Sequence, residues 1–195
     1  MPTTNLDAIF KAYDVRGVVP DEWDAEVAGR IGAAFAVFAE SPRILVARDM
    51  RPSGTDLTAA FSAGATAQGV DVVDLGLAST DLAYFAAGHL DAPASMFTAS
   101  HNPAKYNGIK FCLAGARPVG QDTGLAEIKD LAADPPAPAA GASGQVSRQD
   151  LIWLYADHVR SFLDPAVLRP LRVVADTANG MGGLVVPPAF EGLPF

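Results

Sequence analysis

The chain has 195 residues, of which 50% are hydrophobic and 18% charged, a composition that allows a folded core and argues against wholesale disorder. The formal net charge is −8 and the 14 basic residues are scattered, which argues against nucleic acid as a partner. No apolar run reaches the roughly 18 residues that a membrane helix needs. The N-terminus lacks the pattern of a signal peptide, and the single Cys112 excludes an internal disulfide. We therefore expect a cytoplasmic protein with no membrane partner.

Strands and helices are expected to alternate along the first part of the chain. Apolar residues recur at helical spacing after Asp24, which is suited to cap a helix. Such alternation is typical of layered α/β folds, so we expect a mixed, mostly parallel sheet with helices on both faces. The predicted elements that follow are a strand at 43–47, a helix at 52–68, a strand at 70–75, a helix at 80–90 capped by Thr80, strands at 94–97 and 108–113, and a short helix near 122–132.

The segment TASHNP, residues 98–103, lies between the last two predicted strands. A strand that enters this segment must end there, because Pro103 has no N–H for a ladder and asparagine favours turns. The hydroxyl of Ser100 is therefore expected on a loop at the end of a strand, where α/β folds keep their reactive groups.

The charges around this loop indicate an anion site. Residues 92–121 contain no Asp or Glu, although the chain has 22 acidic residues, and they carry Lys105, Lys110 and Arg117. The negative field of the whole chain repels anions. A lysine-bearing segment that is free of acids therefore predicts a local site for an anion such as phosphate, for which lysine is a point-charge partner.

A second unit is expected after a break in composition. Residues 134–146 hold three prolines, two glycines and little apolar bulk, which favours a linker between a first domain at 1–133 and a second at 147–195. One helix and one strand cannot build a core of ordinary domain size, so we expect the start of a second, similar α/β domain that belongs to a longer protein. The elements expected there are a helix from Ser147 to about Leu163, a strand at 171–175 and a turn at 180–183.

Four segments resemble, in chain order, the α-D-phosphohexomutase family. They are FKAYDVRG at 10–17, RDMRPSG at 48–54, TASHNP with the following YNGIK at 98–110, and VADTANGMGG at 174–183. The third resembles the phosphoserine loop of that family, and the first resembles the N-terminal motif of its phosphomannomutase/phosphoglucomutase branch. The fourth resembles the opening of the second of the family's four domains. A lone Ser-His-Asn would be weak, whereas this ordered set is specific.

The resemblance implies an intramolecular phosphotransferase, an isomerase. Ser100 would carry a phosphoryl group, give it to a hexose phosphate of mannose or glucose, and take the other phosphate back from a hexose 1,6-bisphosphate. The family binds Mg²⁺ with a phosphoserine oxygen and an Asp-x-Asp-x-Asp loop, so Ser100 would contribute a metal ligand through its phosphate. No Asp-x-Asp occurs here. The metal loop, the sugar-selecting loop and the C-terminal phosphate loop are therefore expected in missing domains, and the chain alone is expected to be inactive.

The resemblance also implies roles for five neighbours of the serine. Lys110 would be the general acid/base, a role that typically contributes about 10²- to 10⁴-fold. Tyr13 and Arg16 would lie at the edge of the catalytic cleft, where the planar guanidinium suits phosphate. His101 would relay a proton or contact phosphate, and Asn102 would touch the phosphoryl group or hold the loop.

Plainer readings of these residues stay open. Ser100 could bond its own backbone in a turn, and Lys110 could be a solvated lysine. Arg16 could pair with Asp14, Tyr13 could pack locally, and His101 could bond the loop backbone. The residues after the strand at 43–47, namely Arg48, Asp49 and Arg51, are expected to form a structural ion pair and turn outside the site.

Alternative functions are also open. Phosphoglucosamine mutase shares the serine loop but usually differs in the N-terminal motif, and residues 13–17 favour the mannose/glucose branch. A non-catalytic domain that binds sugar phosphate or a partner could keep the same fold. A serine hydrolase is a poor match, because it would place Ser100 in a Gly-x-Ser-x-Gly turn.

Overall fold

The computed structural model describes residues 5–195. The helices are α1 (Leu6–Ile9), α2 (Ala25–Ala39), α3 (Gly54–Ala67), α4 (Thr80–His89), α5 (Leu125–Ala133), α6 (Ile152–Arg160) and α7 (Gly182–Phe190). The strands are β1 (Val15–Val18), β2 (Arg43–Arg48), β3 (Asp71–Leu77), β4 (Ala94–Phe97), β5 (Tyr106–Leu113), β6 (Arg117–Pro118) and β7 (Val146–Arg148). Short 3₁₀ turns lie at Ala114–Ala116, Gln121–Thr123 and Pro165–Val167.

One sheet of seven strands forms the centre of the molecule. Its order is β1-β5-β4-β2-β3-β7, and β6 pairs with β5. The pairs β4–β2, β2–β3 and β3–β7 are parallel, whereas β5 is antiparallel to β1, β4 and β6. Six of the seven strands therefore run in one direction and β5 runs in the other, so the predicted mixed, mostly parallel sheet is confirmed.

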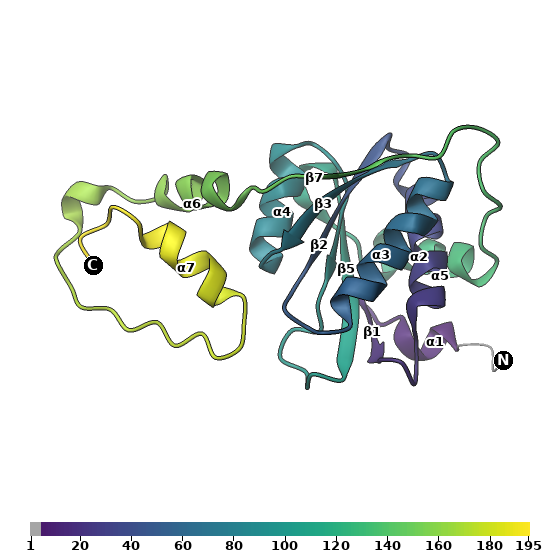
Figure 1. The fold of residues 1–195 in the computed structure, drawn as a ribbon, viewed down its shortest axis with the longest axis horizontal. Helices are drawn as coiled ribbons and strands as arrows, with labels where there is room; N and C mark the ends of the chain where they lie inside the picture. Colours follow the sequence, from purple (N-terminus) through teal and green to yellow (C-terminus); the bar gives the residue numbers. More distant parts are fainter. Residues whose placement is uncertain (1–4) are drawn as a thin grey trace.

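Helices cover both faces of this sheet, as predicted (Figure 1). The residues of β2 alternate between two cores: Ile44 and Val46 face α2, α3 and α5, whereas Leu45 and Ala47 face α4. Both faces of β2 are buried, as in central strands of α/β proteins, which explains why its sequence is a continuous apolar run. Cys112 lies buried in the second core and behaves as a small apolar residue.

The helix pair α2–α3 packs unusually closely because glycines line the contact. A Cβ added at Gly32 would lie 2.1 Å from the carbonyl oxygen of Phe61, and one added at Gly64 would lie 2.0 Å from that of Gly29. Aromatic rings fill the space beneath the pair, where the centroids of Phe35 and Phe111 are 4.6 Å apart. This layer gives the sheet a rigid support on the face away from α4.

Two predicted helix starts can be compared with the structure. Asp24 caps α2 as expected, and its Oδ1 accepts a hydrogen bond from Val27 N at 3.1 Å. The cap of α4 is Ser79 and not Thr80, because the Ser79 hydroxyl accepts from Leu82 N at 3.2 Å. The sequence placed this cap one residue too late, since adjacent Ser and Thr are both good caps.

The predicted helix from Ser147 to Leu163 is wrong at its start. Residues 146–148 pair in parallel with β3 as β7, and α6 begins only at Ile152 and ends at Arg160. The cause is long-range, because the outer edge of β3 offers free backbone groups and Val72 N donates to Gln145 O at 2.8 Å. The linker between two domains at 134–146 remains a proposal. Its last residue, Val146, is the first residue of β7.

The segment 171–175 does not form the predicted strand. Its neighbour in the structure is the C-terminal stretch, where Leu171 N donates to Pro194 O at 3.1 Å, and the described residues supply no strand to continue the pairing. The turn at 180–183 does lead into an apolar element, the helix α7, which contains Pro187 and Pro188. Figure 1 shows α6, α7 and the loop between them beside α4, away from the other helices.

Across residues 5–195, every helix is too short or too polar to cross a membrane.

Candidate active site

The serine loop connects β4 to β5 at the carboxyl edge of the sheet. The two strands are antiparallel, with Phe97 opposite Ile109, and Thr98 N donates to Gly108 O at 3.0 Å. Ser100 is exposed and has φ +55°, the left-handed conformation that residues other than glycine rarely adopt. The prediction that Ser100 lies on a loop at the end of a strand is therefore confirmed.

His101 lies beside the serine hydroxyl. Its Nδ1 is 3.3 Å from Ser100 Oγ, and both side chains are exposed. On an extended strand adjacent side chains point to opposite sides, but the left-handed serine turns the backbone and brings them together. The alternative of a bond to the loop backbone has no support in the hydrogen bonds of residues 5–195, whereas a role in proton transfer stays a prediction.

Arg16 and Lys110 meet on one carboxylate. Asp14 Oδ2 is 2.5 Å from Arg16 Nη2 and 3.0 Å from Lys110 Nζ, and the Asp14 side chain is only 10% exposed. The register of β1 with β5 brings them together, since Arg16 lies opposite Gly108. The open alternative of an Arg16–Asp14 pair is thus observed. Because Arg16 and Lys110 share the single carboxylate of Asp14, the net charge of this cluster is positive.

A second feature of Arg16 bears on anion binding. Its Nε is buried and has no hydrogen-bond partner among the described residues, although Nη2 is paired. A buried donor without an acceptor is costly, so this atom is suited to an acceptor supplied from outside the chain. Tyr13 is 79% exposed, which argues against the alternative of local packing.

The predicted site residues form two groups, one on the β4–β5 loop and one on the neighbouring strands β1 and β5. One group is the loop with Ser100, His101 and Asn102, and the other is the cluster of Arg16 and Lys110 on Asp14. Among residues 5–195, no hydrogen bond or ion pair joins the two groups. Lys105 is an exposed loop lysine, with its Nζ 5.8 Å from the centre of the Tyr106 ring.

Sequence reasoning missed a connection to the loop through Arg51. The expected Asp49–Arg51 ion pair is confirmed at 3.1 Å, but Arg48 is not part of it. The Arg51 guanidinium also hydrogen-bonds the backbone of the serine loop. One signal could have found this contact: β2 and β4 are neighbouring parallel strands, so the segments that follow them emerge at the same edge.

The described residues do not make a metal site by themselves. They contain no group of three or more His, Cys, Asp or Glu side chains placed to hold an ion. The carboxylates nearest in sequence and space to the predicted site, Asp14 and Asp49, are already paired with Arg16, Lys110 and Arg51. Magnesium therefore does not fit the protein ligands of this chain alone.

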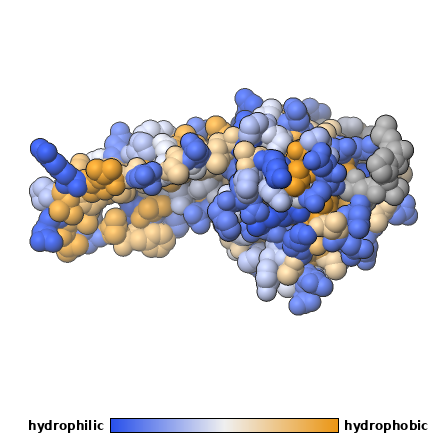
Figure 2. All heavy atoms as spheres, turned by 90° about the horizontal axis from the view of Figure 1, so that it is seen from below, coloured by the Kyte–Doolittle hydropathy of each residue, from blue (hydrophilic) through white to orange (hydrophobic). Residues whose placement is uncertain are grey.

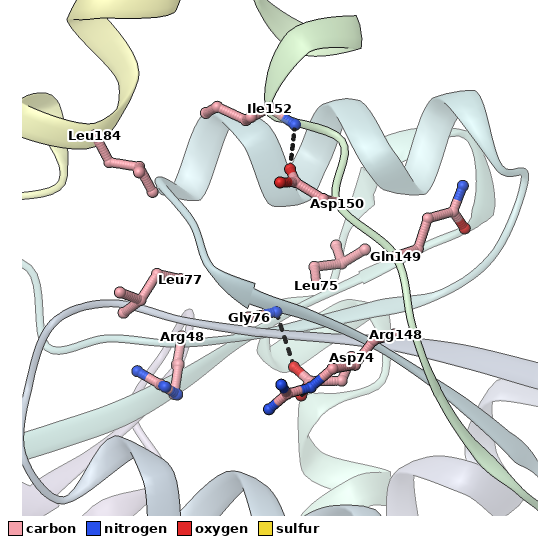
Figure 3. A pocket seen from close by; sticks show the side chains of 10 residues that line it. All are labelled: Arg48, Asp74, Leu75, Gly76, Leu77, Arg148, Gln149, Asp150, Ile152 and Leu184. Carbon is pink, nitrogen blue, oxygen red and sulfur yellow. Dashed lines mark hydrogen bonds and ion pairs between the residues drawn. The ribbon is translucent and has the colours of Figure 1, made fainter.

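A cavity of about 370 Å³ lies elsewhere, beside the ends of β2, β3 and β7 (Figure 3). Arg48 and the Arg148–Asp74 ion pair, 3.3 Å between Nε and Oδ2, lie on one side of it. Asp150 lies on the other side and accepts from Ile152 N at 2.9 Å. None of the predicted site residues lines this cavity, so it is separate from the serine loop.

The fold and these residues define a class of α/β protein in which an exposed serine lies on an acid-free loop at the carboxyl edge of the sheet, and two cations on neighbouring strands pair with one acid. A family model described as phosphoglucomutase/phosphomannomutase, alpha/beta/alpha domain I, matches residues 7–136. Curated relatives include the "Phosphohexose mutases" protein of Xanthomonas campestris, 42% identical over 188 residues, which cover 95% of this chain and 42% of the relative. The "Phosphomannomutase" of Escherichia coli K12 is 38% identical over 180 residues, covering 91% and 40%.

Solved structures agree. A phosphoglucomutase/phosphomannomutase family protein from Burkholderia thailandensis superposes with a TM-score of 0.85 at 34% identity, covering 95% of this chain and 42% of that one. The chain therefore belongs to the phosphoglucomutase/phosphomannomutase family, and the resemblance seen in the sequence is confirmed. It spans about two fifths of the length of the curated relatives it matches.

Proposed function

We propose that this chain is the N-terminal portion of a phosphohexomutase in which Ser100 carries the transferred phosphoryl group. The single observation that carries this proposal is the exposed, left-handed Ser100 on an acid-free loop at the carboxyl edge of the sheet. A hydroxyl presented in this way is open to a phosphorylated sugar, and the family membership supplies the class of reaction.

The proposed chemistry moves one phosphoryl group between two oxygens. The bond from phosphorus to Ser100 Oγ breaks while a bond to a hexose hydroxyl oxygen forms, and the hydroxyl proton leaves to a base. Return of the other phosphate from the hexose 1,6-bisphosphate regenerates phosphoserine. Such transfer depends mainly on positioning and on stabilising charge on the oxygens.

The chain's own residues would share this work. Lys110, held by Asp14 at 3.0 Å, is proposed to exchange the proton of the attacking or leaving oxygen. Arg16 is proposed to bind a phosphate oxygen through its unpartnered Nε. His101, 3.3 Å from Ser100 Oγ, is proposed to assist proton transfer, and Tyr13 and Asn102 to contact phosphate or sugar.

Several finer points belong to this proposal. The substrate is proposed to be mannose or glucose phosphate, since relatives carry the names phosphomannomutase and phosphohexose mutase. Magnesium would bind the phosphate on Ser100 with carboxylates from other parts of a longer protein. We propose a cytoplasmic location and no activity for the 195-residue chain alone.

The first test is whether Ser100 becomes phosphorylated. A longer product that contains this chain would be incubated with glucose 1,6-bisphosphate and examined by peptide mass spectrometry, with mannose 1-phosphate and glucose 1-phosphate as assay substrates. We expect phosphate on the peptide with Ser100 and loss of turnover in Ser100→Ala. Full activity of Ser100→Ala, with phosphate on another residue, would overturn the proposal. Faster turnover of glucosamine 1-phosphate would point to phosphoglucosamine mutase.

Two lysine variants test the division of roles. Lys110→Met should lower kcat by about tenfold to a hundredfold, the lower range for loss of a general acid/base. Lys105→Met removes the same charge from an exposed position and should act mainly on KM. Equal losses in both variants would contradict a specific proton-transfer role for Lys110.

A further inference from the structure

Arg51 uses every donor of its guanidinium on groups of this chain. An arginine side chain has five N–H donors in a fixed planar fork. Nε donates to Asp49 Oδ2 at 3.1 Å, and the other four go to backbone carbonyls of the serine loop. Those carbonyls are Pro103 O at 2.8 Å and Tyr106 O at 2.9 Å from Nη1, and Ser100 O at 2.8 Å and Asn102 O at 2.7 Å from Nη2.

A second arm of the same network reaches the other side of Ser100. Thr98 Oγ1 donates to Asp49 Oδ2 at 2.7 Å and accepts from Ser100 N at 3.0 Å. The peptide group before Ser100 is therefore held by Thr98, and the peptide group after it is held by Arg51. Asp49 joins the two arms, because one of its oxygens accepts from both side chains.

Packing does not explain the shape of this loop. The side chains of His101, Pro103, Ala104 and Lys105 are exposed, so few apolar contacts restrain them. Arg51 and Asp49, in contrast, are only 4% and 6% exposed. The buried ion pair is thus what restrains an otherwise solvent-facing loop, including a serine with an unfavourable positive φ.

We infer that Asp49, Arg51 and Thr98 are positioning residues that hold Ser100 in the left-handed conformation required for phosphoryl transfer. This inference rests on the proposed function of Ser100. Because no guanidinium donor of Arg51 is left for a ligand, the residue acts through the loop backbone and does not contact phosphate. Lysine cannot replace it, since one ammonium cannot reach carbonyls spread over seven residues.

Thr98→Val is the sharpest variant, because it keeps the shape of the side chain and removes the hydroxyl that links Asp49 to Ser100 N. In a longer, active product that contains this chain, we expect kcat and the rate of Ser100 phosphorylation by glucose 1,6-bisphosphate to fall about tenfold to a hundredfold, the loss typical of a misplaced reacting group. KM for glucose 1-phosphate should stay within about twofold, since the substrate contacts are intact. Thr98→Ser, which restores the hydroxyl, should recover most of the lost rate.

Arg51→Lys tests the other arm and should lower kcat at least as far. Arg30→Lys is its matched control: Arg30 also donates to two backbone carbonyls, Ala132 O and Ala133 O, far from the loop, and its variant should keep kcat. Melting temperatures of all variants separate loss of fold from loss of positioning. If Arg51→Lys does not fold, the two Thr98 variants decide the question.

The outcomes are distinct for the two proposals. Unchanged kcat and phosphorylation rate in Thr98→Val, with Ser100→Ala inactive, would overturn the positioning inference alone. A fall in kcat that only follows the folded fraction in each variant would do the same. Full activity of Ser100→Ala would overturn both, because there would be no phosphoserine to position.

Discussion

Two regions of the molecule bury their apolar side chains to very different extents. One is the α/β sandwich, by which we mean the sheet with helices α1 to α5, and the other is the C-terminal segment, residues 161–195. In the sandwich, Phe35, Phe61 and Phe111 are buried within one core. In the C-terminal segment only Pro188 and Ala189 are buried, and Phe162 and Val174 are 75% and 95% exposed. Figure 2 shows the contrast as a largely hydrophobic surface at the end of the molecule that holds this segment.

The difference shows what an apolar sequence needs to become regular structure. α7 forms because a helix satisfies its own backbone hydrogen bonds. Residues 171–175 are also mostly apolar, with Arg172 as their one charged residue, but a strand must find its partners elsewhere, and the described residues provide none to continue a ladder. The two regions should therefore differ in hydrogen exchange and in their response to substitution.

Hydrogen exchange of the 195-residue chain should separate the two regions most strongly. Amides of β2 and β4 should exchange only on global unfolding, which in small domains costs about 5–15 kcal/mol. Amides at 172–176 donate no hydrogen bond among the described residues and should exchange at nearly the unfolded rate. Strong protection at 172–176 in this chain would show that the contrast is wrong.

Truncation of an aromatic ring should have unequal effects in the two regions. Phe61→Ala removes a fully buried ring whose centroid lies 5.3 Å from that of Phe97, so the free energy of unfolding should fall by about 3–5 kcal/mol. Phe162→Ala removes an exposed ring and should change it by less than about 0.5 kcal/mol. Urea unfolding followed by circular dichroism measures both. Similar losses would mean that the C-terminal segment is packed more tightly than its exposure indicates.

A methyl group added at a glycine gives a smaller effect of the same kind. In Gly32→Ala the new Cβ would meet Phe61 O, and the unfolding free energy should fall by about 1–3 kcal/mol despite the better helix propensity of alanine. In Gly183→Ala the nearest atom, Thr177 Oγ1, is 3.8 Å away, so the change should be neutral or slightly stabilising. A neutral Gly32→Ala would show that α2 and α3 can separate at no cost.

The smallest effect is expected for chemical labelling of Cys112, because the thiol of the folded chain should hardly react. Burial raises the pKa of its thiol to about 11, so the reactive thiolate is a minor species well below that pH. At pH 8 a maleimide reagent should label the native chain slowly and the urea-unfolded chain completely, as followed by intact mass. Fast stoichiometric labelling without urea would contradict the burial of this strand.

Local chemistry explains which parts of the fold could be predicted. β2 was found because a central strand is buried on both faces and reads as an apolar run, and α2 because Asp24 caps a periodic pattern. The serine loop was found because Pro103 and Asn102 must end a strand. In each case the signal lies within a few residues of the feature it predicts.

The misses involve partners that are far apart in the sequence. Ser147 is in a strand only because the edge of β3, more than seventy residues earlier, is open to it. Arg51 serves the loop only because β2 and β4 are neighbours in the sheet, which no local pattern records. The unpartnered Nε of Arg16 is likewise a feature of the folded chain that no local pattern of residues records.

The way Arg51 binds the loop has a consequence for how this sequence can vary. Within the loop the guanidinium contacts only backbone carbonyl oxygens and no side chain, so its four hydrogen bonds constrain the number of residues in the loop. Exchanges at the exposed Ala104 and Lys105 leave all four oxygens in place and are tolerated by this contact. One inserted residue between Ser100 and Tyr106 would move at least one oxygen away from its donor. The loop is thus free in composition at these positions and fixed in length.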